Sequence, residues 1–443
     1  MSRQLTALRT LTQVKLPVWS ANFEGRKPTY TFSQKVREVI LSEPDDARQL
    51  AEETALGGIG IMLRVFNLRR LALQQPLVES LTPSQRESVT KSLQQRLSLI
   101  QGPPGTGKTH VACAILAIWA SIFGPLGERI LAVADSNVAA DNLYAARLGA
   151  SGIQAVRLGQ GKEADYDISQ TIRQLQTAAA PACPNVGLNL FSTVPFGHSD
   201  AGDAGASSLK LTTYMDFKAT VVVATCIGSG TEIVNLKTTG GSFQRVLVDE
   251  CTQACEPAVL VALGRRCEQV VLVGDHAQLP ATVLSKAASH EGLSTSLFER
   301  MANQNCVEPT VLLEQRRMHS SIAEFPNSAF YGGRLINAAD DASLTAIPGF
   351  PWPSPDCRVC FVDVSQGPSM LEGRRGFSAF NVAEAETLVD VLHSILSAGY
   401  PAEQIVVLTA YLAQKQEIRR VLRDRGLSNY LQHVAVDTVD GYQ

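Results

Sequence analysis

A glycine-rich segment at residues 102–109 constrains the fold of this chain more than any other feature. Its sequence, Gly-Pro-Pro-Gly-Thr-Gly-Lys-Thr, fits the phosphate-binding pattern G-x-x-x-x-G-K-S/T. A short apolar run at 97–100 precedes it and a long apolar segment follows Lys108, so we expect a strand, a loop and a helix in that order. In this arrangement backbone N–H groups and the helix N-terminus face phosphate oxygens. We therefore predict an ATP-binding α/β domain rather than an ordinary glycine turn.

The residue types in this loop suggest individual roles. Lys108 is expected to reach the β and γ phosphates, and the Thr109 hydroxyl to ligate Mg²⁺. ATP and Mg²⁺ are therefore the predicted cofactors. The residues predicted to bind the nucleotide are Gly102, Pro103, Pro104, Gly105, Thr106, Gly107, Lys108 and Thr109.

Two acids follow a second apolar run, at 246–248. As the carboxyl ends of parallel strands share one edge of the sheet, Asp249 and Glu250 are expected near the phosphate loop. We predict that Asp249 holds Mg²⁺ together with Thr109. Glu250 is predicted to orient and deprotonate the attacking water, because hydrolysis depends mostly on positioning and charge stabilisation.

Two further polar positions are weaker candidates for catalysis. Gln278 follows an apolar run at 270–273, and it could hydrogen-bond the γ-phosphate or the attacking water. It could equally be a polar loop residue. Arg317 opens a second αβ block, and an arginine of that kind can stabilise transition-state charge from a neighbouring domain. Taken alone, an Arg-Arg pair is more often a solvated face.

The order of apolar runs predicts parallel sheets covered by helices on both faces. The expected strands are 97–100, 130–134, 221–224, 246–248 and 270–273, and in the second block 359–364, 405–409 and 434–439; its expected helices are 383–398 and 413–423. We divide the chain into an N-terminal helical support segment (1–80, with a helix expected over 44–56), a first domain (81–305) and a second domain (306–443). Residues 160–218 are expected to form a flexible insertion, because 178–208 are rich in Ala, Gly, Ser and Pro.

Composition limits the class of protein. The hydrophobic content of 45% and the charged content of 18% are typical of a globular protein, and the net charge of −3 argues against a polybasic, DNA-coating protein. Nine scattered cysteines favour free thiols in a reducing compartment. No signal peptide is visible, and the longest apolar run, 111–123, is shorter than the ~20 residues of a membrane span. We expect a cytoplasmic, or also nuclear, protein that does not enter a membrane.

Taken together, these motifs resemble superfamily-one helicases of the nonsense-mediated-decay type, the regulator-of-nonsense-transcripts ATPases. The resemblance covers residues 81–443. It rests on the phosphate loop and on Ser136-Asn137-Val-Ala-Ala-Asp141, Ala224-Thr225-Cys226-Ile-Gly228, Asp249-Glu250-Cys-Thr252-Gln253, Gly274-Asp275-His276-Ala-Gln278-Leu279, Arg317-Met-His319 and Val439-Asp440-Gly-Tyr-Gln443.

The resemblance implies two RecA-like P-loop NTPase domains, with ATP between them and a single strand of nucleic acid across their tops. The expected activity is ATP-driven 5′-to-3′ translocation and unwinding on RNA, and the expected partners include decay or ribonucleoprotein factors. Gln85 matches the family's adenine-recognising glutamine, Arg316 stands at its adenine-stacking position and Arg317 matches its γ-phosphate arginine. The positions implied to lie along the nucleic-acid backbone are Ser136, Asn137, Thr225 and Thr409.

The sequence departs from the family pattern at several positions. Arg316 replaces a tyrosine, Asp135 replaces a proline before Ser136, and Ala410 replaces a proline before Tyr411. The sequence also ends inside a Gln-Gly-x-Glu motif at Gln443, so we expect the second domain to be incomplete. These 443 residues alone are then expected to bind ATP·Mg²⁺ but to hydrolyse it poorly.

Two other readings remain open from the sequence. The chain could be an ATP-gated RNA-binding clamp that does not translocate. It could also be a related DNA helicase, because the expected contacts are to the nucleic-acid backbone and do not separate RNA from DNA.

Overall fold

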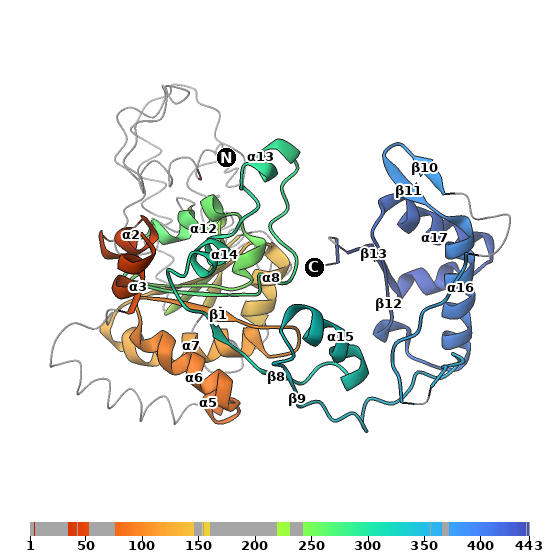
Figure 1. Cartoon of the computed structure of the whole chain (residues 1–443), viewed down its shortest axis with the longest axis horizontal. Coiled ribbons are helices and arrows are strands. Elements are labelled where there is room, and N and C mark those ends of the chain that lie inside the picture. The colour runs from red at the N-terminus through yellow and green to blue at the C-terminus, as the bar shows by residue number, and fades with distance from the viewer. Residues whose placement is uncertain are drawn as a thin grey trace, which may run out of the picture. The chain divides into compact units, whose positions relative to one another are not determined.

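The computed structural model describes residues 34–41, 43–52, 76–145, 153, 155–159, 219–230, 242–354, 356–365, 372–439 and 441–442, together with Gln4. It divides into two compact units, Met1–Glu314 and Gln315–Gln443, shown in Figure 1. The insertion predicted at 160–218 and the end of the helix predicted at 44–56 lie outside the described residues.

A seven-stranded parallel sheet forms the centre of the first unit. Its strand order is β3-β4-β2-β5-β6-β1-β7. The strands are β1 (Leu97–Gln101), β2 (Ile130–Ala134), β3 (Ala155–Arg157), β4 (Val221–Thr225), β5 (Arg245–Val248), β6 (Gln269–Gly274) and β7 (Thr310–Val311). The parallel α/β class and the five strands predicted for this unit are confirmed. Because β1 and β6 are parallel neighbours, the loop after β1 and the turn after β6 lie at the same edge of the sheet.

Helices cover both faces of this sheet (Figure 1). Side chains of β1 alternate between two cores: Leu97 and Leu99 face one, and Ile100 faces the other. The first core is completed by α2 (Gln34–Leu41), α3 (Pro44–Glu52), α12 (Glu256–Leu263) and α14 (Leu297–Asn303). The second contains α5 (Pro76–Glu79), α6 (Pro83–Gln94), α7 (Lys108–Phe123) and α8 (Asn137–Leu143). This burial on both faces explains why the strands are continuous apolar runs and not alternating ones.

Helix α7 follows the phosphate loop directly and is long and strongly apolar. Together with the turn after it, over Lys108–Leu126, it has a mean hydropathy of 1.7, and among the described residues it is the one helix that meets the length and composition of a membrane span. The core helix of a globular domain meets the same test. Every residue from Val111 to Trp119 is buried, so the helix is accounted for by packing against the sheet.

The described part of the N-terminal segment packs on the sheet. Val36, Val39 and Ile40 of α2 are almost fully buried in the first core. The Arg300 guanidinium on α14 joins this layer by donating to the Ile40 carbonyl oxygen and to both carboxylate oxygens of Glu256. Helix α2 therefore shares a core with Leu97 and Leu99 of β1, the strand that leads into the phosphate loop.

Residues 306–314 belong to the first unit, whereas the sequence led us to begin the second domain at 306. The reason is β7, which pairs in parallel with the end of β1. The backbone N–H of Leu312 continues this pairing by donating to the Gln101 carbonyl oxygen at 2.9 Å. The segment that leads into the second unit is thus attached beside the phosphate loop.

The second unit is a smaller α/β assembly. Strand β8 (Glu314–Gln315) spans the boundary between the two units. The elements that follow it are α15 (Ser320–Phe330), β9 (Ile336–Asn337), the hairpin β10–β11 (Gly373–Arg375 and Ser378–Phe380), α16 (Val382–Ser397), β12 (Val406–Thr409), α17 (Leu412–Asp424) and β13 (Ala435–Thr438). Helix α13 (Lys286–His290) belongs to the first unit. Strands β12 and β13 are parallel, and α16 and α17 supply their core.

One strand predicted for the second unit is wrong. Residues 359–364 have an apolar, β-branched composition, but the structure shows them as irregular. Phe361 is 88% exposed, so the run buries little surface. The parallel pair β12–β13 forms without it. Local β-propensity alone does not make a strand when the segment neither pairs nor packs.

Candidate nucleotide-binding site

The phosphate loop connects the end of β1 to the N-terminus of α7, and its glycines are required by its shape. Gly105 and Gly107 have φ angles of 75° and 82°, in the left-handed region that only glycine enters easily. A Cβ on Gly102 would collide with the Lys108 side chain, lying 2.8 Å from Cδ. The Thr106 hydroxyl donates to the Pro103 carbonyl oxygen at 2.7 Å and closes the turn. The backbone is therefore curled tightly around Lys108.

The Lys108 ammonium group lies at the centre of the site. Its Nζ donates to the Gly102 carbonyl oxygen at 3.0 Å and lies 3.5 Å from a Glu250 carboxylate oxygen. The Lys108 side chain is 11% exposed and that of Glu250 is 26% exposed. The structure thus brings together the loop lysine and the acid that the sequence placed at the end of a different strand.

Asp249 lies at the buried end of β5. Burial raises the pKa of its carboxyl group to about 7, and the neighbouring Glu250 charge adds to the rise. The Lys108 charge and hydrogen bonds from the Glu250 backbone and the Thr109 side chain act in the opposite direction. This carboxylate lacks a full positive counter-charge, and a cation placed beside it would lower its pKa.

The donor set at Asp249 and Thr109 fits Mg²⁺. Both groups offer oxygen atoms, which this ion prefers. Among the residues that the structure describes, no group of three or more His, Cys, Asp or Glu side chains converges on one point. A site with few protein ligands is what Mg²⁺ uses when phosphates and waters complete its octahedron. The close-fitting glycine loop fits a phosphate group in the same way, because its backbone approaches without side chains in between.

Glu250 has a strained backbone. Its φ of 47° places a residue with a long side chain in the left-handed region, which costs on the order of 1–3 kcal/mol and is concentrated at functional sites. The tight packing around it fixes this conformation. A Cβ on Gly274 of β6 would lie 2.8 Å from Cys251 Sγ and 3.1 Å from the Thr252 backbone nitrogen. The turn after β5 is therefore pressed against the end of β6.

Asp275 links three elements at this edge. It is fully buried, and its carboxylate accepts hydrogen bonds from Gln101 Nε2 at 3.1 Å and from Gln278 Nε2 at 2.7 Å. Its backbone N–H and carbonyl both pair with the Thr252 hydroxyl at 3.2 Å. Gln278 is thus linked through Asp275 to Gln101, the last residue of β1 before the loop. Sequence reasoning did not identify Gln101, whose one available signal was a polar residue at the end of an apolar strand.

Gln85 contacts the phosphate loop from α6. Its amide oxygen accepts from the Thr82 backbone N–H at 3.0 Å, and its amide nitrogen donates to the Thr106 carbonyl oxygen at 2.8 Å. Thr82 and Gln85 form a capping box at the start of α6. In this structure, Gln85 therefore supports the loop backbone directly.

The candidates for nucleic-acid contact have partners within the protein. Ser136 caps α8 by accepting from the Ala139 backbone N–H at 3.0 Å. Thr225 accepts from the Gly228 N–H at 3.0 Å. Thr409, in the second unit, accepts from the Tyr411 N–H at 3.2 Å. These hydroxyls shape the turns after β2, β4 and β12, and their backbone positions are fixed as a result.

The side chain of Asn137 is hydrogen-bonded to a buried arginine. The Arg157 guanidinium is 2% exposed, donates to the Asn137 side-chain oxygen at 3.1 Å and pairs with Asp141 at 2.8 Å. Arg157 is a further residue that the sequence did not single out. It connects the turn after β2 to β3 at the same edge as the phosphate loop.

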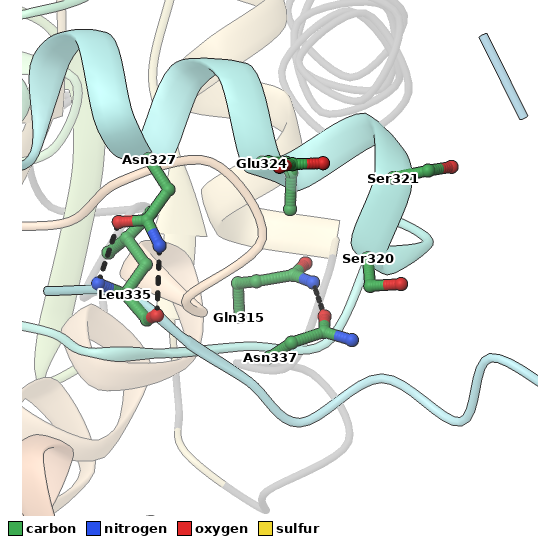
Figure 2. A pocket seen from close by; sticks show the side chains of 8 residues that line it. Gln315, Ser320, Ser321, Glu324, Asn327, Leu335 and Asn337 are labelled. Atoms are coloured by element: carbon green, nitrogen blue, oxygen red, sulfur yellow. Dashed lines mark hydrogen bonds between the residues drawn. The ribbon is translucent and has the colours of Figure 1, made fainter. Parts of the chain in front are cut away.

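Arg316 and Arg317 lie in the second unit, and both side chains are exposed. The fully buried Gln315 shapes their turn: its amide oxygen accepts from the backbone N–H groups of Arg317 and Met318, and its nitrogen donates to the Met318 carbonyl oxygen at 2.7 Å. Figure 2 shows Gln315 also bonded to Asn337, beside a cavity of about 350 Å³ under α15. Arg316 and Arg317 are thus exposed on a turn whose backbone conformation is stabilised by Gln315.

Comparison with known proteins agrees with this geometry. Two family models, each described as an AAA domain, match residues 80–183 with 207–286 and residues 293–443. The chain is 34% identical over 382 residues to a regulator of nonsense transcripts 1 homolog of Arabidopsis thaliana, and 34% identical over 380 residues to the ATP-dependent helicase NAM7 of Saccharomyces cerevisiae. Both alignments cover 83% of the chain. The chain belongs to the regulator-of-nonsense-transcripts family.

The match to this family is partial in length. The chain spans 29% of the Arabidopsis relative and 37% of the yeast relative. Among solved structures, an Arterivirus nonstructural protein 10 (helicase) bound to DNA matches 63% of this chain and 48% of its own, at 13% identity and a TM-score of 0.31. At that score the likeness adds nothing to the sheet order and loop geometry described above.

Replacing Asp249 by Asn is expected to stabilise the metal-free chain above neutral pH. Because the folded pKa is raised to about 7, the native state keeps its proton longer than the unfolded state. Ionisation of Asp249 therefore does not reduce the free energy of unfolding of the wild type below pH ~4, and it reduces that free energy as the pH rises through 7. Asn cannot ionise, so the difference in free energy of unfolding between the variant and the wild type should grow between pH 4 and 7 to on the order of a few kcal/mol.

Thermal melts of both proteins between pH 4 and 8.5, without Mg²⁺, measure this effect. The exposed Glu291→Gln substitution is the control and should follow the wild-type profile. A variant whose melting temperature stays parallel to that of the wild type across this range would show that Asp249 ionises normally.

Proposed function

We propose that this chain is an ATP- and Mg²⁺-dependent translocase and helicase on single-stranded nucleic acid, with RNA as the preferred strand. The main support is that Lys108, Glu250 and the buried Asp249 lie together beside the glycine-rich phosphate loop. These groups follow two different strands of the sheet: Lys108 comes from the loop after β1, and Asp249 and Glu250 follow β5. Their convergence is what phosphoryl transfer to water requires.

In this proposal each residue at the edge has one task. The loop backbone and Lys108 hold the phosphates, and Thr109 and Asp249 hold Mg²⁺, which neutralises charge on the phosphates when it is bound. Glu250 accepts the proton of the attacking water. Gln278, fixed by Asp275, positions that water or the γ-phosphate. Arg317 is proposed to stabilise charge on the γ-phosphate, and Arg316 to contact the adenine.

The choice of nucleic acid as the mechanical substrate rests on the family. The relatives are named regulators of nonsense transcripts and an ATP-dependent helicase. In this chain, Ser136, Asn137, Thr225 and Thr409 are the proposed contacts to the strand. Short polar side chains and backbone groups at turn positions suit phosphate and sugar contacts that do not depend on base sequence.

The test is nucleotide hydrolysis in the presence of a 30-nucleotide oligo(U) RNA or an oligo(dT) DNA of equal length. We expect RNA to accelerate hydrolysis of ATP·Mg²⁺ more than DNA does, and the acceleration to fall with added salt because the contacts are to phosphates. Stronger stimulation by DNA would instead favour a DNA helicase. Nucleotide-dependent RNA binding with no stimulation would favour a clamp, and failure to bind ATP would refute the proposal altogether.

A further inference from the structure

The phosphate loop is held from one side by a chain of hydrogen bonds that begins at Glu314. The Glu314 Oε2 atom accepts from the Thr82 hydroxyl at 2.8 Å and from the Ser84 hydroxyl. Thr82 in turn fixes the Gln85 amide, whose nitrogen donates to the Thr106 carbonyl oxygen in the loop. Thr82 and Gln85 therefore connect Glu314, the last residue of the first unit, to the loop that follows β1.

The geometry leaves little slack along this chain. Thr82 and Gln85 exchange two hydrogen bonds in the capping box, so the Gln85 side chain has one orientation. A Cβ on Gly107 would lie 2.8 Å from Gln85 Nε2, which shows how closely this amide presses on the loop. Displacing Thr82 would move Gln85, and with it the Thr106 backbone.

Ser84 anchors the same chain a second time. Its hydroxyl accepts from the Leu313 backbone N–H at 3.1 Å while donating to Glu314. The pairing of β7 continues to Leu312, whose backbone N–H donates to Gln101, and the Leu312 side chain lies 3.4 Å from where a Gly102 Cβ would stand. Residues 312–314 are thus fastened both to α6 and to the first residues of the loop.

The charge of Glu314 suits this role. Partial burial by itself would raise the pKa of Glu314. The hydrogen bonds from Ser84 and Thr82 outweigh this effect and hold the pKa below its ordinary value. The carboxylate stays ionised at neutral pH. A charged acceptor makes shorter and stronger hydrogen bonds to hydroxyl groups than a neutral one.

We propose that Glu314 is a positioning residue for nucleotide binding: through Thr82, Ser84 and Gln85 it sets the conformation of the phosphate loop and couples that loop to the segment leading into the second unit. It does not touch the nucleotide. The inference rests on the proposed nucleotide-binding function, and it predicts reciprocity. What loosens the Glu314 contacts must weaken nucleotide binding, and nucleotide binding must tighten the Glu314 contacts.

The test compares Glu314→Ala with Glu314→Gln in the full chain. With a fluorescent ADP derivative and Mg²⁺, Ala is expected to weaken binding by about fivefold or more, as coupled sites usually do. Gln should restore affinity to within about threefold, because its amide oxygen can accept from both hydroxyls. The exposed Glu308→Ala, from the same segment, is the matched control and should bind like the wild type.

Hydrogen exchange without nucleotide supplies a second readout that does not depend on the proposed function. Glu314→Ala should speed amide exchange in peptides covering 102–109, and Glu308→Ala should not. If the wild type binds no nucleotide but exchange in the loop still responds to Glu314, the proposed function fails and the structural coupling stands.

A double-mutant cycle separates positioning from general destabilisation. Ser84→Ala removes one of the two hydroxyl contacts that Glu314→Ala removes together, so the double variant should weaken binding little more than Glu314→Ala does alone. Additive losses would overturn the inference, as would wild-type exchange at 102–109 in Glu314→Ala. Loss of affinity with no rescue by Gln would overturn it too.

Discussion

Replacing Lys108 by Ala should weaken binding of ATP·Mg²⁺ by about 10–100-fold, the value of one or two charge-assisted hydrogen bonds to phosphate. Hydrolysis at saturating ATP should fall by a further ~10²–10³-fold, because the ammonium group also stabilises charge that develops in the transition state. The fold should survive: the Lys108 contacts are to Gly102 and Glu250 at the mouth of the site, and the core residues of α7 begin at Val111.

A fluorescent nucleotide titration and single-turnover hydrolysis measure the two parts separately. Lys91→Ala is the matched control, because Lys91 is 49% exposed and pairs with Glu87 on the surface of α6. It removes the same charge from the same unit and should leave both values unchanged. Unaltered nucleotide affinity in Lys108→Ala would mean that the loop does not bind phosphate.

Glu250→Gln should separate binding from chemistry. Its amide keeps the size and the position of the side chain but cannot accept a proton, so single-turnover hydrolysis should fall by about 10²–10⁴-fold, the usual contribution of a general base. Affinity for ATP·Mg²⁺ should be equal or slightly higher, since a negative charge 3.5 Å from Lys108 Nζ is removed from the phosphate site. This combination distinguishes Glu250 from Lys108, whose loss weakens both.

The same two assays apply to this variant, with the exposed Glu268→Gln as control. That substitution removes one carboxylate from the same unit, directly before β6 and away from the loop, and it should behave as the wild type does. If Glu250→Gln hydrolysed ATP at the wild-type rate, another group would have to activate the water. If it lost nucleotide affinity, Glu250 would be a structural partner of Lys108.

Much of the nucleotide site could be predicted from the sequence because its requirements are local. A tight loop demands glycines at positions such as Gly105 and Gly107, and the strand and helix on either side follow from apolar runs. The pairing of Asp249 and Glu250 with the loop could also be predicted, since parallel strands end at one edge. The strand predicted at 359–364 failed because nothing in a short apolar run shows whether another strand will pair with it.

What the sequence alone determined is therefore the phosphate loop at 102–109, its parallel α/β setting and the two acids after β5. The tertiary structure alone decided which side chains hold that loop in place. Gln101 meets Asp275 across 174 positions, and Ser84 meets Glu314 across 230. Contacts at such separations depend on how the strands are ordered in the sheet, and strand order is set by packing of the whole core and not by any local pattern.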